Sequence, residues 1–271
     1  MKVCFTINCM RQHDDFLAYD EFISKGYFQG CELFFPYNVS SEQRDLYTKE
    51  VEKLVNKHKD LELVLHLPHG GSNNNFINED GSVNNETLNR MKDACLYASN
   101  FRVSKLTLHL GTAWPNMNRK LLLDKVLNQV KILADFALSF GMFLMIENMP
   151  RDTELGYGIK EMKYIMEYLE KDCKNTKFIL DTGHCNVSCD KLDDYVIELH
   201  DYLYHMHIHD NNGKSDEHKP LHYGNIDFDS YFKTLSKYHY NELHCLEIIF
   251  NSPKELEQNY LDINEYSNYY L

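Results

Sequence analysis

Eight short apolar segments recur along the 271-residue chain, and stretches with helical spacing separate them. Most of these segments are rich in Val, Ile, Leu and Phe, as strands buried on both faces are. They cover residues 2–7, 30–34, 62–66, 104–109, 142–147, 177–181, 202–207 and 243–249. Strands that alternate with helices in this way form a parallel sheet, because parallel neighbours need a crossover connection.

Amphipathic stretches fill the gaps between the predicted strands. Residues 41–57 carry Leu46, Val51, Leu54 and Val55 at helical spacing, and residues 117–140 carry a longer apolar stripe. Similar patterns occupy residues 86–100, 160–170, 190–199, 229–238 and 253–266. One strand and one helix, repeated about eight times at roughly 34 residues each, is the arithmetic of a (β/α)8 barrel of about 250 residues.

The alternative for such a chain is a doubly wound open sheet. That fold normally carries a glycine-rich turn after its first strand, whereas the first strand here continues into Asn8-Cys9-Met10-Arg11. No Pro-, Gly- or Ser-rich linker and no change of composition divides the sequence. We therefore predict an α/β fold, a (β/α)8 TIM barrel, with a single domain over residues 1–271.

The charge balance narrows the function classes. The chain has 41 acidic and 28 basic residues, for a formal net charge of −13. A protein that holds nucleic acid through bulk charge normally has the opposite balance. An excess of carboxylates instead suits a site that binds divalent cations.

Cysteine usage and hydropathy indicate the compartment. The eight cysteines are scattered, and no pair has C-x-x-C spacing, so we expect reduced thiols in a cytosolic protein. The N-terminus turns polar too early for a signal peptide, and no run approaches the roughly 18 apolar residues of a membrane span. These patterns predict a cytoplasmic location and no membrane partner.

An ionisable residue stands at or near the end of six predicted strands. In chain order these residues are His66, His109, Glu147, Asp181 with the nearby His184, the series His205, His207 and His209, and Glu247. A charged side chain that ends a buried strand is costly unless it is paired. In a barrel these ends converge at one mouth, where active sites lie. Alternation places His66 on the face of Val64, Glu147 on that of Met145 and Asp181 on that of Ile179, so we expect them to point into the barrel together.

The segment that follows the seventh strand is rich in potential metal ligands. Residues 205–222 hold five of the 14 histidines in the chain, several times the share of an even spread. Histidines and carboxylates at this density are typical ligands for Zn²⁺, Mn²⁺ or Fe²⁺. Within the segment, Asp216 and His218 form a closely spaced pair on a predicted loop.

Each of these residues also has a simpler interpretation. A lone histidine at a strand end is more often a hydrogen-bonded core residue than a ligand, and Asp181 is equally typical of a helix cap. His205 and His209 stay ambiguous between core histidines and, for His209, a group that orients a ligand. Glu32 either faces the same mouth or forms a structural ion pair. The recurrence of ligand-type residues at one barrel end favours a metal site over separate coincidences.

The chain resembles the xylose isomerase-like TIM barrels, which include sugar phosphate isomerases and epimerases, inosose-pathway enzymes and the endonuclease IV branch. The resemblance runs from the third strand to the eighth, with its motifs in the family's order. These motifs are Leu65-His66-Leu67-Pro68, Leu108-His109-Leu110-Gly111, Ile146-Glu147-Asn148, Leu180-Asp181-Thr182-Gly183-His184, His207-Ile208-His209-Asp210-Asn211, Asp216-Glu217-His218, Gly224-Asn225-Ile226-Asp227 and Leu246-Glu247.

The resemblance implies two nested sets of metal ligands. An epimerase-type site corresponds to Glu147, Asp181, His207 and Glu247. The endonuclease IV branch adds five ligands, enough for three zinc ions: His66, His109, His184, Asp216 and His218. The sequence departs from that branch after His66, where Leu67-Pro68 stands in place of the usual Tyr and Asn.

The resemblance implies a divalent-metal-dependent isomerase or epimerase acting on a sugar, sugar phosphate or related polyol ketone. The metal would stabilise an enediolate as a Lewis acid, and Glu147 and Glu247 would move the proton α to the carbonyl. His69, Arg151 and His209 would contact the substrate. Zinc is the favoured metal, ahead of Mn, Fe, Co or Mg, with one to three ions bound.

Two other functions stay open from the sequence. The first is an endonuclease IV-like zinc-dependent phosphodiesterase that acts at abasic DNA sites, which the full ligand set favours and the charge of −13 disfavours. Nucleic acid is a partner only under this alternative. The second is a non-catalytic carbohydrate-binding barrel, which requires the intact ligand set to be vestigial.

Overall fold

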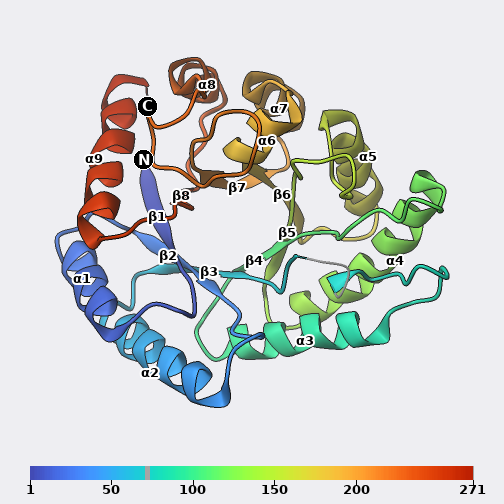
Figure 1. The fold of residues 1–271 in the computed structure, drawn as a ribbon, viewed down its shortest axis with the longest axis horizontal. Coiled ribbons are helices and arrows are strands. Elements are labelled where there is room, and N and C mark those ends of the chain that lie inside the picture. The colour runs from blue at the N-terminus through green and yellow to red at the C-terminus, as the bar shows by residue number, and fades with distance from the viewer. Residues whose placement is uncertain (71–73, 271) are drawn as a thin grey trace.

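The computed structural model describes residues 1–70 and 74–270 and closes eight parallel strands into one barrel in chain order (Figure 1). The strands are β1 (Lys2–Ile7), β2 (Gly30–Phe34), β3 (Glu62–His66), β4 (Lys105–Leu108), β5 (Phe143–Glu147), β6 (Thr176–Asp181), β7 (Leu203–Ile208) and β8 (Leu243–Leu246). β1 pairs with both β2 and β8, which closes the ring. The predicted single-domain (β/α)8 TIM barrel is therefore confirmed.

Helices surround the strands and follow the chain around the ring (Figure 1). They are α1 (His13–Ser24), α2 (Ser41–Lys57), α3 (Asn85–Ser99), α4 (Arg119–Leu138), α5 (Ile159–Glu170), α6 (Thr182–Ser188), α7 (Leu192–Leu199), α8 (Phe228–Leu235), the 3-10 turn η2 (Ser236–Tyr238) and α9 (Pro253–Tyr270). The sequence pattern predicted most of these helices but not α1 or α6. α6 has only 7 residues, too few to show a helical period.

Local chemistry explains where the helices start and which face they bury. In α2 the Ser40 side chain accepts a hydrogen bond from the Gln43 amide and so caps the first turn. The helix then buries Val51, Leu54 and Val55 against the strands. Leu46, expected on the same face, is instead 53% exposed.

Two apolar layers result from this arrangement. The larger layer lies between the strands and the helices. The smaller one fills the inside of the barrel and consists of Cys4, Val64, Met145, Ile179, Leu243 and Cys245. Val64, Met145 and Ile179 therefore point inward, as side-chain alternation predicted.

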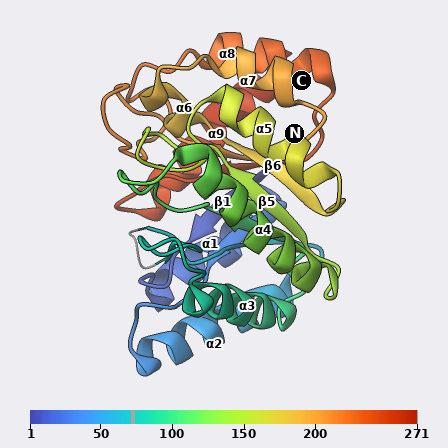
Figure 2. The same ribbon diagram turned by 90° about the vertical axis from the view of Figure 1, so that its right-hand side faces the viewer.

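The carboxyl ends of the strands form the mouth of the barrel. In the side view of Figure 2 the long connection from β7 to α8, coloured orange, lies at the left-hand end, and both chain termini lie toward the right. β4 ends at Leu108 and β8 at Leu246, so His109 and Glu247 directly follow their strands rather than lying inside them. Both residues thus stand at the mouth.

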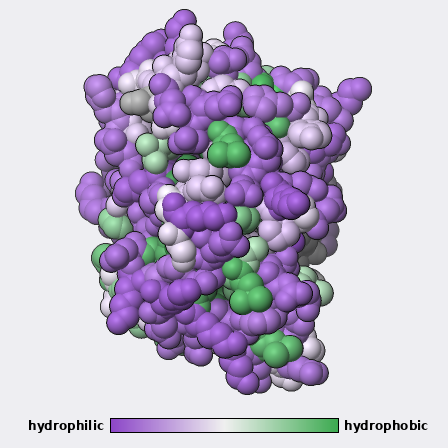
Figure 3. All heavy atoms as spheres, turned by 90° about the vertical axis from the view of Figure 1, so that its left-hand side faces the viewer, coloured by the Kyte–Doolittle hydropathy of each residue, from purple (hydrophilic) through white to green (hydrophobic). Residues whose placement is uncertain are grey.

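The face of the molecule drawn in Figure 3 is mostly hydrophilic. Figure 3 shows the side covered by α9 and α1, where hydrophobic residues form small separate patches. Isolated exposed residues such as Leu17 and Leu261 are normal for a globular protein. Among the described residues, no helix combines the length and apolar character needed to cross a membrane.

Candidate metal and acid–base site

Three carboxylates converge on one imidazole at the centre of the mouth. The Nδ1 atom of His207 lies 2.8 Å from Glu247 Oε2, 3.3 Å from Glu147 Oε1 and 3.7 Å from Asp181 Oδ2. Glu147, Asp181 and His207 are fully buried, and Glu247 is 8% exposed. The four residues come from β5, β6, β7 and the end of β8. The structure thus brings together the four residues that the resemblance implied as an epimerase-type site.

Asp181 serves two purposes at the end of β6. It is the N-cap residue of α6, and its side chain accepts from the His184 amide. Its carboxylate also lies 3.0 Å from His209 Nε2. Gly183 makes this approach possible, because a Cβ at this position would come within 1.9 Å of the His209 ring. The turn that carries Asp181 therefore needs glycine for packing against His209.

A group of histidines flanks the centre on the side of β3 and β4. His109 Nε2 lies 2.9 Å from Glu147 Oε2, and His66 Nε2 lies 3.8 Å from the same oxygen. The His66 ring stacks on Phe34 at 4.8 Å, which fixes its plane. His69 packs its ring 4.4 Å from that of His66 and 5.2 Å from that of His109. The three histidines also have ligand atoms close enough to share a cation.

A second group flanks the centre on the side of β6 and β7. Asp216 Oδ2 lies 3.3 Å from His184 Nε2 and 3.0 Å from His218 Nε2. His218 has a positive φ of 46°, and its Nδ1 lies 2.9 Å from the Glu247 carbonyl. Its ring stacks on that of His209 at 4.1 Å. All nine residues of the larger implied ligand set thus lie around one mouth.

Burial and charge act against each other on the carboxylates. Burial alone would raise the pKa of Glu147, but the charges of His109 and His207 outweigh it and hold the pKa well below its usual range. The pKa of Asp181 and that of Glu247 are lowered in the same way, against burial, by neighbouring imidazoles. The carboxylates at the centre are therefore ionised at neutral pH.

The imidazoles shift in the opposite direction. Burial lowers the pKa of His207, but Glu247, Glu32 and Glu147 together raise it well above its usual range. Burial also lowers the pKa of His218, but nearby carboxylates outweigh burial and raise this pKa to about 9. The carboxylates of this mouth thus stabilise the protonated, positively charged forms of His207 and His218.

A polar layer lies beneath the mouth, and it contains Glu32 and His205, whose roles the sequence left open. Glu32 on β2 accepts from His205 Nε2 at 3.0 Å, from His207 Nε2 at 2.8 Å and from Thr107 Oγ1 at 2.7 Å. All of these residues are fully buried. Glu32 therefore faces the barrel interior and makes a structural ion pair as well, so the two interpretations of its sequence position were not exclusive.

The donor set at the centre fits a divalent cation. The positive groups that lower the pKa of Glu147, Asp181 and Glu247 are imidazoles, and the carboxylates also act on one another. Imidazole and carboxylate are the donors that zinc, manganese, iron and cobalt take in proteins. Buried carboxylates gathered this closely repel one another unless positive charge lies between them, which a bound cation supplies.

The predicted substrate contacts lie in different places. His69 lies at the mouth and is half-buried, and Arg151 after β5 is exposed. His209 is fully buried and directs its Nε2 at Asp181. Its position suits the orientation of a carboxylate, the second of the two roles that the sequence left open.

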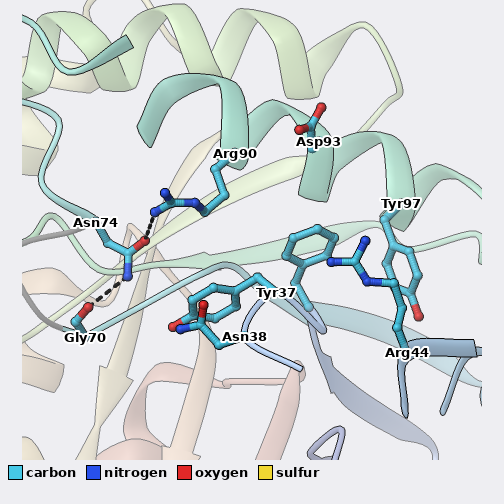
Figure 4. Close-up of a pocket in the computed structure, with 9 residues that line it drawn as sticks. Tyr37, Asn38, Arg44, Gly70, Asn74, Arg90, Asp93 and Tyr97 are labelled. Carbon is cyan, nitrogen blue, oxygen red and sulfur yellow. Dashed lines mark hydrogen bonds between the residues drawn. The ribbon is translucent and has the colours of Figure 1, made fainter. Parts of the chain in front are cut away.

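Tyr37, Gly70, Asn74 and Arg90 are among the residues that line a polar cavity of about 600 Å³ (Figure 4), and two of them contact the backbone of His69. Tyr37 Oη and Asn74 Nδ2 both donate to the His69 carbonyl, at 2.5 and 3.0 Å. Asn74 is held in turn by Arg90, whose guanidinium donates to Asn74 Oδ1 at 2.8 Å. The wall of this cavity thus fixes the backbone that presents His69 to the mouth.

Comparisons with known proteins agree with this geometry. Residues 24–263 match the profile of a family described as xylose isomerase-like TIM barrel. The uncharacterized protein MJ1311 of Methanocaldococcus jannaschii is 27% identical over 227 residues, which cover 81% of this chain and 72% of that protein. Similarity at this level extends over most of both chains.

Solved structures share the fold over nearly the whole chain. A D-tagatose 3-epimerase-like protein has a TM-score of 0.77 at 22% identity, with 99% of this chain and 97% of the other covered. The IolI protein, in a structure with a zinc atom, has a TM-score of 0.78 at 14% identity, with 100% and 99% covered. At these identities the likeness shows a common fold.

Proposed function

The chain belongs to the xylose isomerase-like TIM barrel family, and from this premise we propose that it is a divalent-metal-dependent isomerase or epimerase of a sugar, sugar phosphate or related polyol ketone. One observation carries the proposal: Glu147 and Glu247 both approach the same ring nitrogen of His207, at 3.3 and 2.8 Å. Two carboxylates next to one ligand position offer a base and, once one of them has taken up a proton, an acid for proton transfer at a carbon.

The metal ligands in this proposal are Glu147, Asp181, His207 and Glu247, with zinc as the favoured ion. A bound divalent ion supplies a Lewis acid for a substrate carbonyl and its neighbouring hydroxyl. His209 holds the Asp181 carboxylate at 3.0 Å, and Glu32 holds His207 at 2.8 Å. Such partners fix the direction in which a ligand offers its lone pair.

The two glutamates move the proton. One ionised carboxylate takes the proton from the carbon next to the carbonyl. The other first takes up a proton from solvent and then delivers it to the opposite face, which inverts that carbon. Delivery to the neighbouring carbon instead gives isomerisation. Glu247 keeps 8% of its surface exposed, so it has direct access to a substrate in the mouth. His109, at 2.9 Å from Glu147, is placed to take up or return a proton there.

Contacts to the rest of the substrate come from the rim. His69 faces the mouth beside His66 and His109 and can donate to a sugar hydroxyl. The exposed Arg151 can meet a phosphate or hydroxyl at the far end of the substrate. The solved structure described as a D-tagatose 3-epimerase-like protein supports a ketose as the substrate class.

Exchange of the substrate's α-proton with solvent tests this proposal. The metal-loaded protein is incubated in D2O with a panel of ketoses, ketose phosphates and inososes, and loss of the α-proton signal is followed by NMR. We expect exchange in the wild type and its loss in both Glu147→Gln and Glu247→Gln. Glu217→Gln, at a half-buried residue of the β7–α8 connection that pairs with Lys219, is the matched control and should keep exchange. Metal content of each variant separates loss of chemistry from loss of the ion.

A second candidate function rests on the five further residues at the mouth. His66, His109, His184, Asp216 and His218 surround the centre as the endonuclease IV-like ligand set requires, enough for three zinc ions. Such a site would cleave a phosphodiester at an abasic DNA site through a metal-activated water. The net charge of −13 gives little electrostatic attraction to intact duplex DNA. Cleavage of an abasic-site duplex, with no α-proton exchange across the ketose panel, would favour this function over the isomerase.

A further inference from the structure

Beneath the mouth, two cysteines and a histidine face one another inside the barrel. Cys4 on β1 and Cys245 on β8 are register partners on neighbouring strands, and both belong to the apolar layer inside the barrel. His205 comes from β7, which pairs with β8. All three side chains are fully buried, and one ligand atom from each lies within 4.8 Å of the others. We call these three residues the floor cluster.

The partner of the His205 ring decides which nitrogen faces the two sulfur atoms. Nε2 lies 3.0 Å from Glu32 Oε2. An ionised carboxylate only accepts hydrogen bonds, so Nε2 carries the proton and donates it. Nδ1 therefore holds a lone pair, and among the described residues it is buried without a hydrogen-bond partner. A buried acceptor without a partner is unfavourable, so this atom is placed to receive a ligand.

We propose that Cys4, Cys245 and His205 form a second metal site, which holds a zinc ion through two thiolates and one imidazole. Bonds of about 2.3 Å to sulfur and about 2.0 Å to nitrogen put neighbouring ligand atoms of a tetrahedral zinc site roughly 3.5–3.8 Å apart. The floor cluster already lies within 4.8 Å, a difference that side-chain rotation can cover. Sulfur donors distinguish this site from the mouth, whose donors are nitrogen and oxygen.

Charge balance suits the buried location. Two thiolates neutralise Zn²⁺ and a neutral imidazole adds no charge, so the occupied site brings no net charge into the barrel interior. Burial raises the pKa of the Cys4 and Cys245 thiols, so both are protonated before the ion binds. Binding forms two Zn–S bonds and releases two protons, one from each sulfur, to solvent.

Glu32 provides the support that metal-bound histidines have in other proteins. A histidine ligand usually donates its second N–H to a carboxylate, as His205 does to Glu32. The same oxygen, Oε2, also accepts from His207 Nε2 at 2.8 Å. One carboxylate thus orients a histidine of the floor cluster and a histidine of the mouth. An ion in the floor cluster would fix Glu32 and, through it, the ring of His207.

Cobalt substitution tests the floor site in the full chain. The protein is stripped with a chelator and reloaded with Co²⁺, and the near-ultraviolet absorption that arises only from thiolate-to-cobalt charge transfer is measured. We expect this band in the wild type. Cys4→Ser and Cys245→Ser should each lose the band and bind about one metal ion fewer per chain than the wild type. Cys31→Ser, which alters a fully buried thiol on β2 outside the barrel interior, should keep the band; its loss there would contradict the assignment.

Two further measurements keep the floor site separate from the mouth. Asp181→Asn weakens the mouth and should leave the charge-transfer band in place. Zinc X-ray absorption of the wild type needs no cysteine variant and should show sulfur neighbours at about 2.3 Å. A wild type that is fully loaded with metal, yet shows only nitrogen and oxygen neighbours and no band, would overturn the floor site. That outcome leaves the proposed isomerase intact, because α-proton exchange depends on the mouth.

Discussion

Glu32 Oε2 lies 2.8 Å from His207 Nε2, inside the barrel and directly beneath the mouth. This contact fixes the orientation of the His207 ring: Nε2 donates to Glu32, and Nδ1 turns toward Glu247, Glu147 and Asp181. The residue at the centre of the candidate site is thus oriented by a carboxylate that itself lies outside the mouth.

Replacement of Glu32 should therefore weaken metal binding at a distance. Glu32→Gln keeps the size of the side chain but removes its negative charge, and a neutral amide oxygen is a weaker acceptor for the two rings than a carboxylate oxygen. We expect a loss of metal affinity of about 10- to 100-fold, measured by competition with a chelator. Thr107→Val is the matched control, because Thr107 donates to the other oxygen, Oε1, at 2.7 Å. Equal losses in the two variants would argue against a specific role for the Glu32–His207 contact.

Asp181 combines a ligand position with a helix cap, and two substitutions separate these roles. Asp181→Asn keeps an oxygen for the His184 amide but removes the charge, whereas Asp181→Ala removes both. We expect both variants to lose metal. Only the alanine variant should also lose about 0.5–2 kcal/mol of unfolding free energy, because it lacks the helix cap. Metal analysis and urea unfolding measure the two effects.

The control for Asp181 lies on another helix. Asp227 caps α8 and accepts from the Ser230 amide, away from the centre of the mouth. Asp227→Ala should lower stability by about 1 kcal/mol while metal content stays unchanged. Unchanged metal content in Asp181→Ala would mean that Asp181 is only a cap.

Gly183 is expected to tolerate no side chain. Gly183→Ala places a Cβ within 1.9 Å of the His209 ring, so either α6 or His209 has to move. Overpacking of this kind costs about 1–3 kcal/mol, and movement of His209 releases its contact with Asp181. We expect lower stability together with weaker metal binding. A variant that binds metal as tightly as the wild type would show that His209 does not need to hold Asp181.

The sequence predicted the barrel and the residues at its mouth because both depend on local patterns. A buried parallel strand is an apolar run of about five residues, and an ionisable residue such as Glu147 or Asp181 that ends such a run stands out. Parallel pairing then places every strand end at the same mouth. Topology thus predicted that these strand ends meet, and the family resemblance implied how the residues, including Asp216 and His218 on a loop, group into ligand sets.

The same kind of argument could not predict the contacts at the floor of the barrel. Glu32 and His205 are 173 positions apart in the sequence, and nothing near either residue indicates the other. Cys4 and Cys245 come together only because β1 and β8 close the ring. Their side chains meet through closure of the barrel, which a one-dimensional pattern does not show.

Acid sensitivity should come in part from His244, whose side chain on β8 packs outside the barrel against Phe232 and Tyr240. Burial lowers the pKa of His244 to about 3, from an ordinary value of 6.5. Between these values the unfolded chain binds a proton that the folded chain does not. The stability that neutral His244 provides is therefore fully present above pH 6.5 and is lost as the pH falls toward about 3.

His244→Phe removes this proton-binding difference while keeping an aromatic ring between Phe232 and Tyr240. From pH 7 to about pH 5 the wild type should lose roughly 2 kcal/mol more stability than the variant, measured by urea unfolding at both pH values. His200→Phe is the matched control, since His200 is exposed and packs against Tyr238 with ring centroids 4.3 Å apart; it should follow the wild type. If His244→Phe also follows the wild type, the acid sensitivity comes from other groups, and the buried imidazole of His244 takes no part in it.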